Sequence, residues 1–265
     1  GWMTRQSICQ WQGIKCNQNK RVKSIVLGQV NLNGTIPESI GNLEDLTNLF
    51  LSYNTLYGTI PLSISKLKNL EYFSFENNAL NGSVPSELFS LSNLVGINLG
   101  ENNFDPWQIP ATISKLTKLR SFTADSSNLV GTIPQELANL PNLVTVNLKD
   151  NHLHGTLPAF VSQKLDDLSI SSNRISGPLL VNSLKSLQSL HVSGNEFSGE
   201  FTFPYDNIDS ITALMIADNQ FTSISTDLFN ASVPVLFYCS AANNNFTCPI
   251  PDWMRENCEA ECVSR

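Results

Sequence analysis

Leu46-Thr-Asn-Leu49-Phe-Leu51-Ser-Tyr-Asn54-Thr-Leu56-Tyr-Gly58-Thr-Ile60-Pro61 decides the fold, because phrases like it recur along the whole chain. The Asn position of the phrase falls at residues 30, 54, 78, 102, 127, 151, 173, 195, 219 and 244, in steps of 22 to 25 residues. A fixed period of this size indicates stacked repeats, because one unit cannot bury its apolar face alone and neighbouring units bury a continuous one. The sequence therefore predicts a solenoid of about ten coils.

Each part of the phrase has a physical role. Leu49 and Leu51 are two residues apart, so they share one face of a short strand, and Phe50 between them points outward. After the proline, apolar residues recur every third position, which suits a 3₁₀ or helical segment with one face on the core: Ile64, Leu67 and Leu70. The pattern predicts an α/β repeat with a parallel sheet.

The column of asparagines allows a functional and a structural interpretation. A row of outward amides would suit a sugar or a metal. An inward amide in each coil would instead satisfy buried backbone groups at the turn, and we favour this role because such groups must be paired. Val30 and Ser127 interrupt the column.

Six cysteines lie near the two ends: Cys9, Cys16, Cys239, Cys248, Cys258 and Cys262. They lack the CxxC or Cys/His spacing of a metal site and indicate disulfide-bonded caps in an oxidising compartment. Cys9 and Cys16 are expected to pair. The other four allow three pairings, of which Cys239–Cys258 with Cys248–Cys262 is preferred. We expect caps at residues 1–21 and 248–265 around repeats at 22–247, in one continuous domain.

The repeated unit LxxLxLxxNxLxGxIPxxLxxLxxL resembles the plant-type leucine-rich repeat of receptor-kinase and receptor-like-protein ectodomains. Cys9-Gln-Trp11-Gln-Gly13-Ile-Lys-Cys16 is similar to the N-terminal cap element of that family, with Trp2 at an upstream cap position. The resemblance implies a right-handed solenoid, a concave parallel sheet and a second sheet around the GxIP segments. The C-terminal cysteine segment departs from the usual plant cap, so an algal or protist surface protein is an alternative source.

Composition and motifs argue against several classes of protein. The net charge is −7 and no basic stripe runs along the chain, so nucleic acid is not an expected partner. No apolar run approaches the roughly 20 residues of a membrane span, and no signal peptide remains at the start. No catalytic motif is present, and His152 and His154 lack further ligands for a metal. We expect no enzymatic activity, cofactor or metal.

Four sequons are consistent with N-linked glycans in a secretory pathway, although such triplets also arise by chance in an Asn-rich repeat. They begin at Asn33, Asn81, Asn230 and Asn245. Asn33 and Asn81 precede the glycine of the phrase, where a side chain should face outward. Asn245 is close to Cys248, which makes it less accessible.

The outward positions of the predicted strands form the expected binding surface. They gather aromatic and acidic residues from coils two to six, and the candidates are Phe50, Tyr53, Glu76, Glu101, Asp125 and Asp150. Trp107, next to Pro106 on an irregular loop, is a further candidate, with packing against the next coil as the equal alternative. Aromatic and acidic groups on a rigid sheet suit a protein or peptide partner with a basic, partly apolar surface.

Three functions remain open. The first is an extracellular or cell-surface recognition or adhesion module that binds a protein or peptide on its concave face. The second is a structural subunit of a cell-surface coat or filament, assembled by head-to-tail contacts. The third is a secreted inhibitor of a wall-degrading enzyme, similar to plant polygalacturonase inhibitors. Self-association or a co-receptor would fit the first two.

Overall fold

The computed structural model describes residues 7–181, 183–203, 211–225 and 236–263. The predicted cap residue Trp2 and the predicted glycan site Asn230 lie outside these ranges. The chain forms two compact units, Gly1–Asn128 and Leu129–Arg265, and each is built from repeated strand and turn segments.

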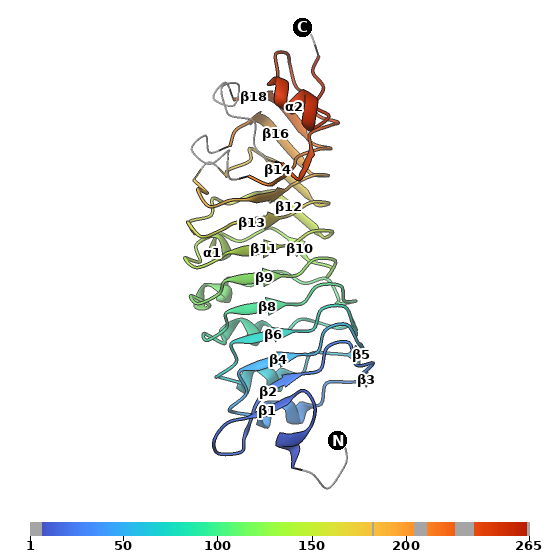
Figure 1. The fold of residues 1–265 in the computed structure, drawn as a ribbon, viewed down its shortest axis with the longest axis vertical. Coiled ribbons are helices and arrows are strands. Elements are labelled where there is room, and N and C mark those ends of the chain that lie inside the picture. Colours follow the sequence, from blue (N-terminus) through green and yellow to red (C-terminus); the bar gives the residue numbers. More distant parts are fainter. Residues whose placement is uncertain (1–6, 182, 204–210, 226–235, 264–265) are drawn as a thin grey trace. The chain divides into compact units, whose positions relative to one another are not determined.

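The first unit has one long sheet, one short sheet and a row of 3₁₀ helices. The long sheet contains β1 (Ile14–Cys16), β2 (Val22–Val26), β4 (Asn48–Phe50), β6 (Tyr72–Ser74), β8 (Gly96–Asn98) and β9 (Ser121–Thr123). All neighbouring pairs are parallel except β1 with β2, which is antiparallel. The short sheet contains β3 (Asn33–Gly34), β5 (Thr55–Gly58) and β7 (Ala79–Leu80). Figure 1 shows the strands lying side by side.

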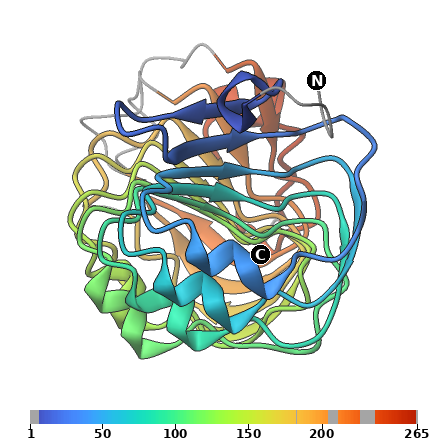
Figure 2. The same ribbon diagram turned by 90° about the horizontal axis from the view of Figure 1, so that it is seen from below.

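The 3₁₀ helices of the first unit are η1 (Ile8–Gln10), η2 (Glu38–Asn42), η3 (Leu62–Lys66), η4 (Ser86–Ser90) and η5 (Ala111–Lys115). From η2 onward each follows a proline, whose fixed φ suits the residue before a helical turn. Figure 2 shows these turns stacked along one side of the unit, across the core from the long sheet. They close each coil as the threefold apolar spacing predicted.

The second unit repeats this plan with a larger second sheet. Its long-sheet strands are β11 (Thr145–Asn147), β13 (Asp167–Ser169), β15 (Ser189–His191), β17 (Ala213–Met215) and β19 (Tyr238–Ser240). Its second sheet contains β10 (Val130–Gly131), β12 (His152–Thr156), β14 (Arg174–Gly177), β16 (Glu196–Phe201) and β18 (Gln220–Ile224). Its described residues also form two short α-helices, α1 (Gln135–Ala138) and α2 (Asp252–Asn257).

The core of each unit is built from the inward positions of the repeat. Leu49, Ile64, Leu67 and Leu70 are all fully buried, as their spacing predicted. Aromatic rings pack together in the core of the second unit, where the Phe221 ring lies against the rings of Phe197, Phe201 and Phe246 with centroids 5.5–6.4 Å apart. Deletion of one such ring typically costs about 3–5 kcal/mol, so these stacks contribute strongly to the second unit.

Three disulfides close the ends of the described chain. Cys9–Cys16 lies in the first unit, and Cys239–Cys258 and Cys248–Cys262 lie in the second, with Cα–Cα distances of 4.7–5.5 Å. These are the pairings that the sequence favoured. Cys239–Cys258 ties strand β19 to the end of α2, so it anchors the terminal segment on the last coil. The cap boundaries at residues 21 and 248 stay a prediction.

Candidate functional site

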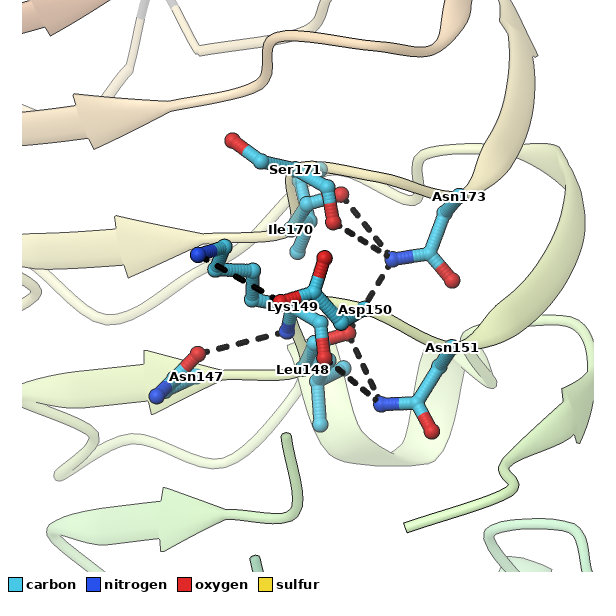
Figure 3. A network of polar contacts seen from close by, with 8 residues as sticks. All are labelled: Asn147, Leu148, Lys149, Asp150, Asn151, Ile170, Ser171 and Asn173. Atoms are coloured by element: carbon cyan, nitrogen blue, oxygen red, sulfur yellow. Dashed lines mark hydrogen bonds and ion pairs between the residues drawn. The ribbon is translucent and has the colours of Figure 1, made fainter. Parts of the chain in front are cut away.

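The asparagine column points inward and holds the backbone of the turns together (Figure 3). The Asn173 amide nitrogen donates to the carbonyl oxygens of Leu148, Ile170 and Ser171 at 3.0–3.1 Å, and its oxygen accepts the Leu153 N–H at 2.9 Å. Donation to carbonyls two and three residues earlier recurs at Asn54, Asn78, Asn102, Asn151, Asn219 and Asn244. The structural interpretation of the column is confirmed.

The two interruptions of the column are accommodated locally. Ser127 is fully buried, and its hydroxyl donates to the Ala124 carbonyl at 2.7 Å, which replaces one of the amide's bonds. The next residue, Asn128, donates to the Phe104 carbonyl at 3.0 Å. Val30 donates its N–H to the Asn54 side-chain oxygen at 3.2 Å, so the first coil uses the amide of the second.

The outward side of the long sheet in the first unit carries what we call the acidic-aromatic face: Phe50, Tyr53, Tyr72, Glu76, Asn98, Glu101 and Asp125. Strand register places Phe50, Ser74 and Asn98 next to one another on β4, β6 and β8. The three carboxylates of the face are Glu76, Glu101 and Asp125, which come from consecutive coils. Exposed cations of the same sheet are Lys23 on β2 and Arg120 directly before β9.

A hydrogen-bond network fixes the central carboxylate of this face. The Tyr53 hydroxyl donates to Glu76 Oε1 at 3.0 Å, and Asn98 Nδ2 donates to Glu76 Oε2 at 3.0 Å. The Asn98 oxygen in turn accepts the Gly100 N–H at 3.0 Å. Asn77 donates to Glu101 on the adjacent turn. The carboxylates are thus oriented before any partner arrives, which lowers the entropy cost of binding.

The hydroxyl of Tyr53 responds to this environment. Its pKa is raised, because the hydrogen bond to Glu76 and the negative charge of Glu76 favour the neutral phenol over the phenolate. Glu101 and Asp125 add smaller effects in the same direction. Three carboxylates therefore act together on one surface group.

A shallow pocket of about 240 Å³ opens on the face beside the network. The Phe50 and Tyr72 rings form one wall, stacked with centroids 6.5 Å apart, and Asn98 and Thr123 line the remainder. Gly96 is required beneath the Tyr72 ring, because a Cβ there would lie only 2.9 Å from Tyr72 Cδ1. The pocket combines flat aromatic surface with polar groups at its rim.

Two residues of the face occupy a backbone conformation that their side chains do not favour. Tyr53 and Glu101 have φ of 58° and 52°, in the left-handed region. The same turn position has a positive φ in the other coils as well, at Gln29, Asn77, Ser126, Asp150, Ser172, Gly194, Asp218 and Asn243. Non-glycine residues in this region cost of order 1 kcal/mol. The conformation is therefore a property of the repeat and does not distinguish this face.

Comparisons with known proteins agree with the repeat pattern. A family model described as Leucine Rich Repeat matches residues 45–67. A probable leucine-rich-repeat receptor-like serine/threonine-protein kinase of Arabidopsis thaliana is 43% identical over 54 residues, which is 20% of this chain and 5% of that protein. The solved plant peptide hormone receptor RGFR1, in complex with RGF2, has a TM-score of 0.82 at 31% identity over 97% of this chain and 45% of its own.

A solved plant ice-binding protein has a TM-score of 0.83 at 28% identity, over 96% of this chain and 84% of its own. The chain spans less than half of the RGFR1 chain and a small fraction of the kinase. These likenesses confirm the predicted leucine-rich-repeat solenoid and the resemblance to plant receptor ectodomains.

The chain is a leucine-rich-repeat solenoid similar to plant receptor ectodomains.

For Trp107 the structure shows packing against neighbouring coils, the second of the two alternatives that the sequence left open, so it is not a binding residue. Trp107 is only 7% exposed, its ring stacks on Phe89 with centroids 6.1 Å apart, and its Nε1 donates to the Ser127 carbonyl at 2.8 Å. The indole therefore fills the coil that has an extra residue and pairs the backbone of the next turn. It offers no surface to a partner.

Asp150 differs from the other predicted acids. It lies in the second unit, where Lys149 Nζ approaches its Oδ2 at 3.3 Å (Figure 3). An exposed ion pair of this kind contributes little stability, but it offsets the negative charge of the carboxylate locally. The sequence argument overlooked Lys149, which takes the same repeat position as Glu76 and Asp125.

The outward face of the second unit carries fewer aromatic and acidic side chains in one place. Small residues dominate it, and its charged groups include Asp167 and His191, on neighbouring strands β13 and β15. Burial raises the pKa of Asp167 and lowers that of His191, and the attraction between the two opposes both shifts. Neither unit of the ectodomain places three or more His, Cys, Asp or Glu side chains around a common point within its described residues.

Sequence reasoning missed Tyr72, Asn77 and the role of Asn98 as a partner of Glu76. Tyr72 stands two residues before Ser74 on the same strand, so strict alternation along β6 would have placed it outward. Its importance depends on Gly96, which is 24 residues away. The predicted glycan sites Asn33, Asn81 and Asn245 are all exposed, and His152 and His154 are exposed on β12.

Proposed function

We propose that this ectodomain is an extracellular recognition module that binds a peptide or protein with a basic, partly apolar surface. The acidic-aromatic face of the first unit is the proposed site. The observation that carries the proposal is the fixed Tyr53–Glu76–Asn98 network beside the Phe50–Tyr72 wall. These outward groups do nothing for the core and together offer oriented negative charge and aromatic area.

The predicted glycan sites are compatible with this surface. Among the described residues, the sequon asparagines Asn33, Asn81 and Asn245 are not outward residues of a long-sheet strand, so glycans there would leave the face open.

The similar proteins favour binding over catalysis and a location at the cell surface. RGFR1 is a peptide hormone receptor solved with RGF2, and the Arabidopsis relative is a receptor-like kinase. No helix among the described residues has the length and apolar character needed to cross a membrane. We propose that the chain works outside the cell, without catalysis or a cofactor, and carries glycans at Asn33, Asn81 and Asn245.

A peptide array tests the proposal directly. Synthetic twelve-residue peptides with graded net charge and apolar content would be immobilised and probed with the labelled, disulfide-intact protein. We expect retention of peptides that combine Lys or Arg with aromatic or aliphatic residues. The double variant Phe50→Ala, Tyr53→Ala should weaken binding about 10- to 1,000-fold, as truncation of interface anchors does.

The matched control changes two exposed residues outside the face, Tyr57→Ala and Leu62→Ala. Retention should be unchanged in this control. Preferred binding of acidic peptides, or equal losses in the control and the face variant, would contradict the proposal.

Ice binding is a second candidate, favoured by one observation in addition to the likeness to the plant ice-binding protein. Thr35, Thr59 and Ser83 are exposed at the same repeat position on successive coils, and the methyl groups of the first two lie against the next coil's glycine position. Such a row repeats at roughly the 4.8 Å strand spacing. A gap between the melting and freezing points of the solution, lost in Thr59→Lys, would support it, and no gap would remove it.

A further inference from the structure

We propose that the Phe50–Tyr72 pocket is an arginine subsite, which takes a guanidinium group of the partner against the aromatic wall and pairs it with the Glu76 carboxylate. This inference rests on the proposed function and names the chemistry of one part of that site. It is carried by the shape of the pocket, the hydrogen bonds of Glu76 and the three carboxylates of the face.

The pocket wall suits a flat cation. Tyr72 lies against Gly96, and the plane of the Phe50 ring is tilted 28° from that of the Tyr72 ring, so both rings offer aromatic area to the pocket. Tyr72 is 37% exposed, so a partner can reach it. A guanidinium is planar and weakly hydrated, and stacks on aromatic faces more readily than an ammonium does.

Glu76 is hydrogen-bonded to the pocket residue Asn98 and has hydrogen-bonding capacity left over. Its two oxygens each accept one bond, from Tyr53 and from Asn98, whereas a carboxylate offers about four lone-pair positions. Asn98 lines the pocket and holds Glu76 at 3.0 Å, so the carboxylate is one hydrogen bond from the pocket wall. An arginine fork can use the remaining positions on both oxygens, while a lysine uses one.

The other occupants are less well matched. An aliphatic side chain would cover the rings but leave Glu76 without a cation beside it. A lysine ammonium would meet the charge but not the plane of the rings. An acidic side chain would be repelled by the carboxylates of Glu76, Glu101 and Asp125 on the same face.

The test uses three peptides that differ in one side chain: acetyl-Gly-Leu-X-Leu-Gly-amide with X as arginine, lysine or citrulline, each carrying a fluorophore. Citrulline keeps the shape of arginine and lacks its charge. We expect fluorescence anisotropy at low salt to give arginine an affinity at least about ten-fold above citrulline and several-fold above lysine. Equal binding of arginine and citrulline, lysine binding as tight as arginine, or no arginine binding would overturn the subsite.

Two variants locate the subsite. Glu76→Gln should bring the arginine peptide to the citrulline level, whereas Glu71→Gln, an exposed acid of the same coil that precedes β6, should leave it unchanged. Gly96→Ala changes no charge and should weaken arginine binding by displacing the Tyr72 ring. Tyr72→Leu gives the same test should the alanine variant fail to fold.

The outcome separates this subsite from the wider proposal. If Glu76→Gln and Gly96→Ala leave arginine binding intact while Phe50→Ala with Tyr53→Ala abolishes retention on the peptide array, recognition stands and the arginine subsite is wrong. If no basic peptide is retained on the array, the recognition function is wrong as well.

Discussion

The two units agree on the inside of the repeat and differ on the outside. Asn102 in the first and Asn173 in the second make the same four hydrogen bonds, three donated to carbonyls and one accepted from a backbone N–H. Outward, the first unit presents oriented acids and aromatic rings, while the second presents small residues, the Lys149–Asp150 pair and a half-buried histidine. Inward positions are constrained by the need to pair the backbone, and outward positions are free to serve a partner.

The two ends of the chain also differ, in the number and span of their disulfides. The largest expected effect on stability concerns these bonds. The second unit holds two disulfides, which span 19 and 14 residues, and the first holds one, which spans 7. Loop-closure entropy gives about 3 kcal/mol for each longer bridge and about 2 kcal/mol for the short one. We expect Cys→Ser replacement of both C-terminal bridges to cost about 5–6 kcal/mol, measured by urea unfolding.

Hydrogen exchange would show which strands lose stability in this variant. The amides of β17 and β19 should lose protection in the C-terminal variant, while those of β4 and β6 keep it. A larger loss from Cys9→Ser with Cys16→Ser would reverse the comparison and show that the N-terminal cap carries more of the stability.

The inward ladder gives the next largest effect and should be equal in the two units. Asn102→Ala and Asn173→Ala each leave three buried carbonyls and one N–H without the side-chain partner, at about 3–5 kcal/mol. Ser127→Ala removes the hydrogen bond from the Ser127 hydroxyl to the Ala124 carbonyl in the same column and should cost about 1–2 kcal/mol. Thermal unfolding of the three variants provides the measurement. Costs for the two asparagines that differ by several kcal/mol would contradict a common structural role.

This division also explains what the sequence revealed. The fold followed from inward residues such as Leu49 and Asn54, because burial and backbone pairing repeat with every coil. The outward positions of Phe50, Glu76 and Asp125 followed from the same register. Trp107 did not, because the partner of its indole is a carbonyl 20 residues later in an irregular coil. Tyr72 lies against Gly96 of the next coil, and Lys149 pairs with the adjacent Asp150. Neither contact recurs with the repeat.

Charge reversal sharpens the difference between the outward faces. Glu101→Lys places a cation on the face that carries the Glu76 and Asp125 carboxylates, so association with a basic peptide should slow about three- to ten-fold at low salt. Asp150→Lys should slow it less, because Lys149 already offsets that carboxylate. Stopped-flow mixing with an arginine-containing array peptide measures both rates, and added salt should reduce both effects. Equal slowing would place the two acids on one functional surface.

The smallest expected effects concern pH, and they fall on opposite sides of neutrality. The pKa of Tyr53 is raised above its ordinary value of about 10, so the stability from its neutral form is fully present below pH 10 and is lost as pH rises through the folded-state pKa. The pKa of His191 is lowered, chiefly by burial, with Asp167 opposing and Lys149 adding to the shift. Its contribution is present above its ordinary pKa of about 6.5 and is lost as pH falls through the lower folded-state value.

Tyr53→Phe should therefore flatten the alkaline decline in stability, and His191→Gln should flatten the acid decline. The exposed His152→Gln serves as the control for the acid side. Urea midpoints measured from about pH 4 to pH 11, with hydrogen exchange to assign each change to a unit, check both signs. If Tyr53→Phe left the alkaline decline as steep as before, the Tyr53–Glu76 bond would not hold in solution, and the oriented carboxylate of the proposed site would lose its main support.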